Sequence, residues 1–253
     1  MLIVDTHCHV STAWYEPVEQ LIQQMDRNSV ENAILVQMGG QYDNSYQAEC
    51  VAMYPDRLVS VVLVDVSSET APDTLSALAA QGARGVRLPA GAPAPDVWRR
   101  AAELRLPVTS LGSPDAFSAP TFSENLDIMG DVPVVVEHLG GLKAASERET
   151  RDAVFALAAR PNAHMKIHGL GEFCRRAMPV TSPFPFEPED VPLLHEAYDA
   201  FGPDRLMWGS DYPPVSGREG YANALRLTMD QFASEADRRA IFGETAARVY
   251  GLM

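Results

Sequence analysis

Two histidines near the start of the chain are the residues whose types and spacing most clearly suggest chemistry. His7 and His9 follow a short apolar run and are separated only by Cys8. In an extended strand alternate side chains point the same way, so the two imidazoles should project together while Cys8 points into packing. Such a pair forms either half of a metal site or part of a proton-transfer cluster. The alternative is two ordinary histidines where a strand ends.

The elements that must position these histidines follow a regular alternation along the chain. Eight short apolar segments alternate with amphipathic stretches, of which 18–25 and 191–201 have clear helical periodicity. Alternating strands and helices predict right-handed crossovers and a parallel sheet. Eight strands in 253 residues predict an α/β fold, a closed (β/α)8 TIM barrel, as one domain over 1–253. An open doubly wound sheet is the alternative, but no Gly-rich phosphate loop follows the first strand. The predicted strands are 2–6, 33–37, 59–65, 84–88, 106–110, 133–137, 163–167 and 205–209.

Polar side chains gather at the carboxyl ends of these predicted strands, where barrels of this type carry their chemistry. Unrelated surface residues would not favour one end of the strands, so we expect a functional site there. The candidates are His7 and His9 after the first strand, Arg87 on the fourth, Glu137 and His138 on the sixth, Lys166 and His168 on the seventh, and Asp211 after the eighth.

The connection at about 170–190 is unusually long and contains four prolines. A loop of this length in a compact domain is typically a lid or a binding loop, the alternative being a surface insertion. It directly follows the seventh strand, which favours a role at the site. Glu172, Arg175 and Arg176 lie on it, either to close over a ligand or as exposed charges.

The composition indicates an ordinary globular protein and bears on its partners. The net charge of −14 disfavours nucleic acid or an anionic membrane as partner. A few buried arginines would still permit a small anionic substrate. No apolar run is long enough to span a bilayer, and no secretory-signal pattern is present. The sequence is compatible with a homo-oligomer and does not indicate one.

The three cysteines predict a cytoplasmic protein without disulfides. Cys8, Cys50 and Cys174 are odd in number and widely spaced. This usage argues against a disulfide framework and fits free thiols in a reducing compartment.

Several motifs, taken together, resemble those of the amidohydrolase superfamily. The resemblance is to its amidohydrolase-2 branch, which includes pyrone-dicarboxylate lactonases, sugar lactonases and aminocarboxymuconate-semialdehyde decarboxylases. It implies a TIM barrel with a hydrolytic or related site at the carboxyl ends of the strands. The motifs are DTHCH at 5–9, GVR at 85–87, EHLGG at 137–141, MKIHG at 165–169, WGSDYP at 208–213 and AARVY at 246–250.

The chain departs from the family pattern in three places. Binuclear members carry a bridging carboxylated lysine or acid on strand four, where this chain has Arg87, which argues against two metals. Decarboxylase-like members carry a metal-binding histidine on strand five, and 106–110 contains none. The lactonase branch lacks it too, which favours lactone hydrolysis. The strand-seven lysine is usually followed by Ser-Gly, and His168 stands at the serine position, so the substrate preference should differ.

The candidate residues suffice for a hydrolytic mechanism. We predict that Asp211 is the general base and that His138 orients the attack on the carbonyl. His7, His9 and Asp211 are the predicted ligands of one divalent metal ion, zinc foremost. Histidines that act without metal, by donating hydrogen bonds to the oxyanion, remain an open alternative. The structural alternatives are a helix N-cap for Asp211 and a core histidine for His138.

Four residues are predicted to bind the substrate. Arg87 has the fork geometry that suits a carboxylate, with a salt bridge to a barrel acid as the alternative. Lys166 and His168 lie two residues apart and share a face. Lys166 is a second anion contact or a structural ion pair, and His168 is a further ligand or a polar wall. Tyr42, in the loop after the second strand, is the fourth.

These residues predict an enzyme that hydrolyses a lactone or related cyclic ester of a small carboxylated or sugar-derived acid. A metal-dependent decarboxylase of the aminocarboxymuconate-semialdehyde type is the alternative, and a barrel kept for ligand binding or assembly is a third. Glu137 is expected to point to the opposite side of its strand. His164 and His195 are expected to be structural.

Overall fold

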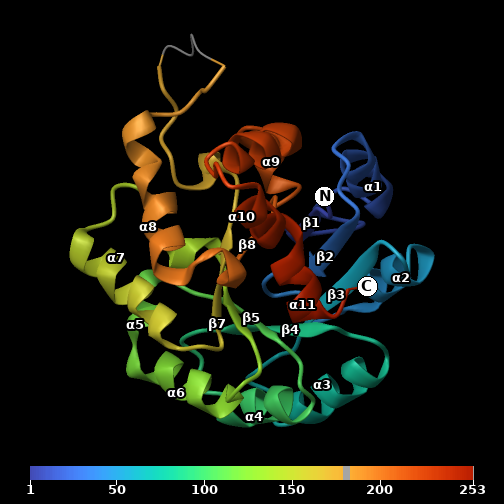
Figure 1. Ribbon diagram of the computed structural model, residues 1–253. Coiled ribbons are helices and arrows are strands. Elements are labelled where there is room, and N and C mark those ends of the chain that lie inside the picture. The colour runs from blue at the N-terminus through green and yellow to red at the C-terminus, as the bar shows by residue number, and fades with distance from the viewer. Residues whose placement is uncertain (179–182, 253) are drawn as a thin grey trace.

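The protein is built on a ring of eight parallel strands, each paired with the next along the chain (Figure 1). The computed structural model describes residues 1–178 and 183–252. The predicted TIM barrel is confirmed, and the strand ends differ from the prediction by no more than two residues. The strands are β1 (Val4–Cys8), β2 (Asn32–Val36), β3 (Leu58–Leu63), β4 (Gly85–Pro89), β5 (Val108–Leu111), β6 (Val134–Val136), β7 (Ala163–Ile167) and β8 (Leu206–Trp208).

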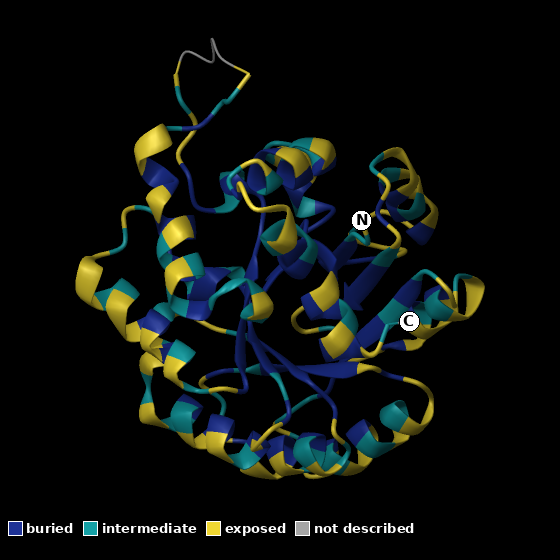
Figure 2. Ribbon diagram, in the orientation of Figure 1, coloured by how far each residue is buried: buried dark blue, intermediate teal, exposed yellow. Residues whose placement is uncertain are grey.

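Helices cover the outside of the ring, so that the strands are buried and the outer helix faces are exposed (Figure 2). Both helices predicted from periodicity are present, and the first buries Val18, Leu21 and Met25. Within the described residues, every helix is too short or too polar to cross a membrane. The α-helices found there are α1 (Val18–Arg27), α2 (Ser45–Met53), α3 (Ala71–Ala80), α4 (Pro95–Glu103), α5 (Pro114–Ser118), α6 (Pro120–Met129), α7 (Arg148–Phe155), α8 (Pro192–Phe201), α9 (Tyr221–Met229), α10 (Glu235–Arg239) and α11 (Thr245–Tyr250).

The ring closes between β8 and β1, where distant parts of the chain meet. Cys8 forms a parallel bridge with Tyr212, and the backbone N–H of Asp211 donates to the carbonyl of His7 at 2.8 Å. Gly209 permits this approach, because a Cβ atom there would lie only 2.7 Å from the Cβ of His7. The closure therefore sets the end of β1 directly beside the residues that follow β8.

A bulge in β1 lies at the first of the two histidines. Asp5 pairs with Ala33 and Cys8 with Leu35, so three steps along β1 match two along β2. Bulges re-aim side chains and are common beside active sites. The backbone N–H of His7 donates to the Asp5 carboxylate at 3.1 Å within this bulge.

Cys8, Cys50 and Cys174 are free and buried. Cys8 donates a weak hydrogen bond to the Ile34 carbonyl at 3.3 Å and packs in the core between strands and helices. Its side chain thus points away from the two histidines that flank it.

The long connection after β7 begins at the mouth of the barrel and then leaves it. A 3₁₀ turn spans Leu170–Glu172, and farther along Arg176 forms an antiparallel bridge with Phe186. The two arms of this segment project beyond the helices (Figure 1). Residues 179–182 lie outside the described part of the chain, and the lid role stays a prediction.

Candidate active site

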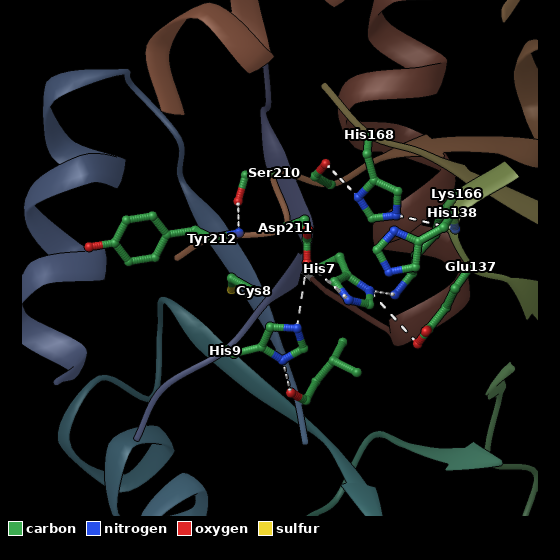
Figure 3. Close-up of polar contacts among 12 residues, drawn as sticks. His7, Cys8, His9, Glu137, His138, Lys166, His168, Ser210, Asp211 and Tyr212 are labelled. Atoms are coloured by element: carbon green, nitrogen blue, oxygen red, sulfur yellow. Dashed lines mark hydrogen bonds and ion pairs between the residues drawn. The ribbon is translucent and has the colours of Figure 1, made fainter. Parts of the chain in front are cut away.

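Four histidines and one aspartate converge at the carboxyl ends of the strands (Figure 3). The ring of His7 lies at the centre, with its centroid 4.9 Å from those of His9 and His138 and 5.0 Å from that of His168. The Asp211 Oδ1 atom lies 3.8 Å from Nε2 of His7 and 3.6 Å from Nε2 of His9. The structure thus brings together five of the predicted site residues.

The tautomer of His9 follows from its hydrogen bond. Its Nδ1 lies 2.7 Å from the carbonyl oxygen of Val36, which can only accept, so Nδ1 carries the proton. In the neutral ring Nε2 then presents a lone pair toward the Asp211 carboxylate. Two acceptors that face each other this closely are stabilised when a cation or a proton lies between them.

His7 is buried, and its Nε2 has no hydrogen-bond partner among the described residues. Its Nδ1 lies 3.5 Å from Nζ of Lys166 and 3.8 Å from Oε1 of Glu137. Burial, together with the nearby charge of Lys166, holds the pKa of His7 well below its usual value. The ring is therefore neutral and has a nitrogen free to bind a ligand.

Asp211 adopts a left-handed backbone conformation, with φ of +58°, as the chain turns away from β8. Its Oδ2 accepts a hydrogen bond from Nη1 of Arg218 at 2.9 Å, which leaves Oδ1 toward the histidines. Burial alone would raise the pKa of Asp211, but its contact with His9 and the other surrounding imidazoles hold it well below the usual value. Asp211 is thus an ionised carboxylate, and this side-chain bond replaces the predicted alternative of an N-cap.

His138 lies just beyond the end of β6, where the chain leaves the extended conformation. It and Leu139 have φ of +51° and +52°. Its Nδ1 is buried without a hydrogen-bond partner in the described chain, and lies 3.8 Å from Oε1 of Glu172. A ring nitrogen left unsatisfied beside Asp211 and His7 does not fit a core histidine held by backbone, and fits a site that receives a ligand.

Glu137 corrects one expectation, because its side chain points into the barrel instead of to the opposite side of the strand. It forms a two-pronged ion pair with Arg87, with N–O distances of 2.9 and 2.7 Å. Glu137 follows the alternation of β6, in which Val135 packs inside the barrel and Val134 and Val136 pack in the outer core. His138 is the residue that departs from this alternation, through its left-handed backbone conformation. Burial alone would raise the pKa of Glu137, but Arg87 keeps it below its usual value.

The side chain of Arg87 has most of its donors engaged inside the barrel. Besides the pair with Glu137, its Nη1 donates to the Gln37 carbonyl at 2.9 Å. The salt bridge that the sequence left open as an alternative is therefore present, and contact with a substrate carboxylate stays a prediction.

Lys166 and Tyr42 differ greatly in their surroundings. Lys166 is fully buried and donates from Nζ to the Thr6 carbonyl at 2.6 Å. Burial lowers its pKa to about 8, although Glu137 partly opposes this shift. Tyr42 is half exposed and lines a cavity of about 330 Å³ together with residues of α2, β3 and α3. The structure thus places Lys166 in the cluster and Tyr42 at a different cavity.

Comparison with known proteins identifies the family. A model of the amidohydrolase family matches residues 4–252. The chain belongs to this family. It is 27% identical to an L-fucono-1,5-lactonase of Burkholderia ambifaria over 242 residues, which cover 88% of this chain and 81% of the relative. A 4-sulfomuconolactone hydrolase of Rhizobium radiobacter is 25% identical over 290 residues, which cover 98% of this chain and 90% of that protein.

Solved structures share the fold of this amidohydrolase. A protein described as probable 2-pyrone-4,6-dicarboxylic acid hydrolase from Acinetobacter baumannii, with citric acid bound, has a TM-score of 0.78 at 22% identity, covering 99% of this chain and 100% of that chain. An amidohydrolase from Burkholderia multivorans with bound zinc has a TM-score of 0.77 at 24% identity, and each chain is covered completely. At these identities the likeness supports the barrel alone.

The residues of this amidohydrolase fit a divalent metal ion. Candidate ligand atoms of His7, His9 and Asp211 lie within 4.8 Å of one another, and all three residues are buried. The free Nε2 atoms of the two histidines and the Oδ1 atom of Asp211 form a mixed nitrogen and oxygen donor set of the kind zinc accepts. The group could therefore hold a metal.

Sequence reasoning missed two residues of the amidohydrolase site. Tyr15 stacks on the ring of His9, with centroids 5.5 Å apart. Arg218 bonds both Asp211 and Glu172, and so joins the loops after β8 and β7. Both residues lie in irregular loops, where no periodicity predicts the direction of a side chain. The one available signal was the position of Arg218, seven residues after Asp211 in the same loop.

Proposed function

We propose that this amidohydrolase hydrolyses a lactone, or a related cyclic ester, of a small carboxylated or sugar-derived acid. The observation that carries the proposal is the ionised Asp211 carboxylate facing the Nε2 atoms of His7 and His9. Relatives that cover most of the chain are named as lactone hydrolases, which supports this chemistry over decarboxylation.

Asp211 acts as the general base that removes a proton from the attacking water. Arg218 holds Oδ2, so that Oδ1 is presented to the reacting groups. Because its pKa is lowered, Asp211 is always ionised near neutral pH but is a weak base. The His9 Nε2 and Asp211 Oδ1 atoms, two acceptors that lie 3.6 Å apart, favour the metal-assisted form of the mechanism over one that uses histidines alone.

His7, His9 and Asp211 would hold one divalent ion, and zinc is the ion we propose. Such an ion would polarise the lactone carbonyl and lower the pKa of the attacking water. His138 orients the attack through its unpartnered Nδ1, at the edge of the cluster. Protonated Lys166 adds a positive charge behind His7 that favours negative charge developing at the mouth.

The substrate is a small molecule, and two of the predicted contacts remain part of the proposal. Lys166 supplies positive charge beneath the cluster, which suits an anionic or polyhydroxylated ring. Arg87, whose charge is paired with Glu137, offers only its remaining N–H donors. Both nitrogens of His168 are engaged within the protein and Tyr42 lines a separate cavity, so neither is kept as a substrate contact. We place the enzyme in the cytoplasm, which the three free cysteines support.

A panel of lactones and candidate acids tests the reaction. Sugar 1,4- and 1,5-lactones and carboxylated unsaturated lactones would be assayed by proton release with a pH indicator. The same reactions would be monitored for carbon dioxide. We expect proton release, and at least about a 100-fold fall in kcat for Asp211→Asn. Carbon dioxide release would instead identify a decarboxylase, and unchanged turnover in Asp211→Asn would refute the proposed base.

Elemental analysis tests the metal. Protein purified without chelators should contain about one zinc per chain, and His7→Ala with His9→Ala should lose it. Wild-type protein freed of metal by a strong chelator should lose activity and regain it with added zinc. Full activity after complete metal removal would leave the histidines as hydrogen-bond donors to the oxyanion.

A further inference from the structure

We propose that His168 is a positioning residue that fixes the ring and backbone of His138. This inference rests on the proposed function, in which His138 orients the attack. It differs from the roles predicted for His168, as a substrate contact, a further ligand or a polar wall. The argument depends on three contacts that His168 makes inside the cluster (Figure 3).

The first contact sets the tautomer of His168. Its Nδ1 lies 3.0 Å from the carbonyl oxygen of Gly209, at the end of β8. A carbonyl only accepts, so Nδ1 carries the proton and Nε2 carries the lone pair. The ring is almost completely buried, with 1% of the residue exposed, so water does not compete for either nitrogen. His168 is thereby locked between β7 and β8.

The second contact uses that lone pair. The backbone N–H of His138 donates to Nε2 of His168 at 3.3 Å. His138 has left β6, so its N–H lies beyond the paired part of the strand, and its φ of +51° is one that residues other than glycine rarely adopt. A buried N–H requires a partner, and here His168 supplies it. The bond therefore supports the backbone turn that directs His138 toward the site.

The third contact is between the rings. The imidazoles of His138 and His168 are stacked, with centroids 4.1 Å apart and an angle of 18° between their planes. One face of His138 is thus covered, and its free Nδ1 edge faces Glu172. Stacking fixes the plane of the His138 ring. The hydrogen bond to the His138 N–H fixes the backbone from which that ring extends. Together they restrict His138 to the orientation in which its free nitrogen can act.

The same contacts disfavour one of the overlapping ligand groups, the one that includes His168. The ligand atoms of His7, His138 and His168 lie close enough to hold an ion. However, both nitrogens of His168 are already engaged, one as donor and the other as acceptor. His168 would have to give up the support of His138 to bind a metal. The group of His7, His9 and Asp211 requires no such loss.

Three substitutions separate the contacts of His168. His168→Phe keeps only the stacked ring, His168→Asn keeps a donor near the Nδ1 position, and His168→Gln places an amide oxygen near the Nε2 position. We expect kcat on the best lactone to fall at least about tenfold in the Phe and Asn variants, with KM within about twofold. His168→Gln should recover several-fold of that loss, because it restores the acceptor for the His138 N–H.

His164→Gln is the matched control. His164 lies on the same strand, is also buried, and also bonds a carbonyl through Nδ1, that of Asn162 at 3.1 Å, but it lies at the opposite end of β7. Its kcat should match that of wild type. A rise in KM with unchanged kcat in His168→Phe would show a substrate contact and overturn the proposal, as would wild-type kinetics in all three variants.

Three readouts do not depend on activity. In ¹⁵N-histidine-labelled protein, His168 should show a protonated Nδ1 and an unprotonated Nε2. The His138 amide signal should shift in His168→Phe and return toward wild type in His168→Gln. Zinc content should be the same in wild type and His168→Phe. The opposite tautomer, an unmoved His138 signal, or loss of zinc would overturn the proposal. If no lactone is hydrolysed by wild type, the proposed function fails, while these readouts still decide the role of His168.

Discussion

The Asp5 carboxylate accepts hydrogen bonds from both the backbone N–H and the hydroxyl of Ser210, at 2.8 and 2.6 Å. It also accepts from the hydroxyl of Tyr221 at 2.9 Å. Asp5 begins the bulge that carries His7, and Ser210 immediately precedes Asp211. One buried carboxylate thus ties the strand of the histidines to the turn that presents the proposed base.

Replacing Asp5 should therefore cost stability as well as activity. In Asp5→Asn the amide nitrogen would replace an acceptor of the Ser210 and Tyr221 hydroxyls. We expect a loss of about 2–3 kcal/mol in the free energy of unfolding, because buried donors would lose their acceptor. Urea unfolding would measure it. Tyr221→Phe removes only one donor and should cost about 1 kcal/mol. A loss in Asp5→Asn no greater than in Tyr221→Phe would contradict this account.

The sequence predicts the barrel and the placement of five site residues for a simple reason. Strand periodicity determines which way His7 and His9 point, and a closed ring brings the ends of all its strands together. Chemistry-bearing residues at the last position of a strand, or immediately after it, are therefore predictable. His9 and His168, each directly after its strand, are of this kind.

The remaining features depend on backbone conformation or on loops that carry no period. The prediction turned Glu137 outward because it assumed that His138 continues the strand. His138 instead takes a positive φ, which residue type alone does not reveal. Arg218 and Tyr15 reach the site from irregular segments, where side-chain direction is set by tertiary contacts. The pairing of Arg87 with Glu137 depends on the direction of the Glu137 side chain. The sequence could therefore give this salt bridge only as an alternative to a substrate contact.

The buried pair of Arg87 and Glu137 should show strong coupling. Removing one partner leaves an uncompensated buried charge, so Arg87→Met and Glu137→Gln should each lose about 3–5 kcal/mol of unfolding free energy. The double variant Arg87→Met/Glu137→Gln should lose much less than the sum of the two. A double-mutant cycle from urea unfolding measures the coupling. Strictly additive losses would mean that the pair does not interact in solution.

His164 should make the protein sensitive to acid. Burial lowers its pKa to about 4, against an ordinary value of 6.5. The unfolded chain therefore binds a proton at a higher pH than the folded chain does. The stability that the neutral ring provides is complete above about pH 6.5 and is lost as pH falls toward 4, by up to about 3 kcal/mol.

The variant His164→Gln isolates this contribution from those of the other histidines. Urea unfolding of wild type and variant at pH 7 and pH 4.5 would be compared. The variant should lose less stability between the two pH values than wild type, by about 2 kcal/mol. Equal losses would show that His164 titrates near its ordinary pKa in the folded protein.

Arg218 should couple the long loop to the proposed base. Its Nη1 bonds Oδ2 of Asp211 and also Glu172, while Nε and Nη2 have no hydrogen-bond partner within the described residues. Arg218→Gln would release both carboxylates, and we expect kcat to fall at least about tenfold because Asp211 loses its fixed orientation. Arg218→Lys should recover part of the loss, since a single nitrogen makes both bonds and an ammonium group has enough donors for them.

Arg151→Gln is the control for this prediction. The Arg151 side chain is 23% exposed, as is that of Arg218, and it also forms an ion pair, with Glu196 between α7 and α8. Its loss should leave kcat unchanged, because that pair lies on the outer helices. Glu172→Gln should reduce kcat less than Arg218→Gln, because Arg218 would still hold Asp211. If Arg218→Gln affected only thermal stability, as Arg151→Gln should, Arg218 would be a structural link between two loops with no effect on the base.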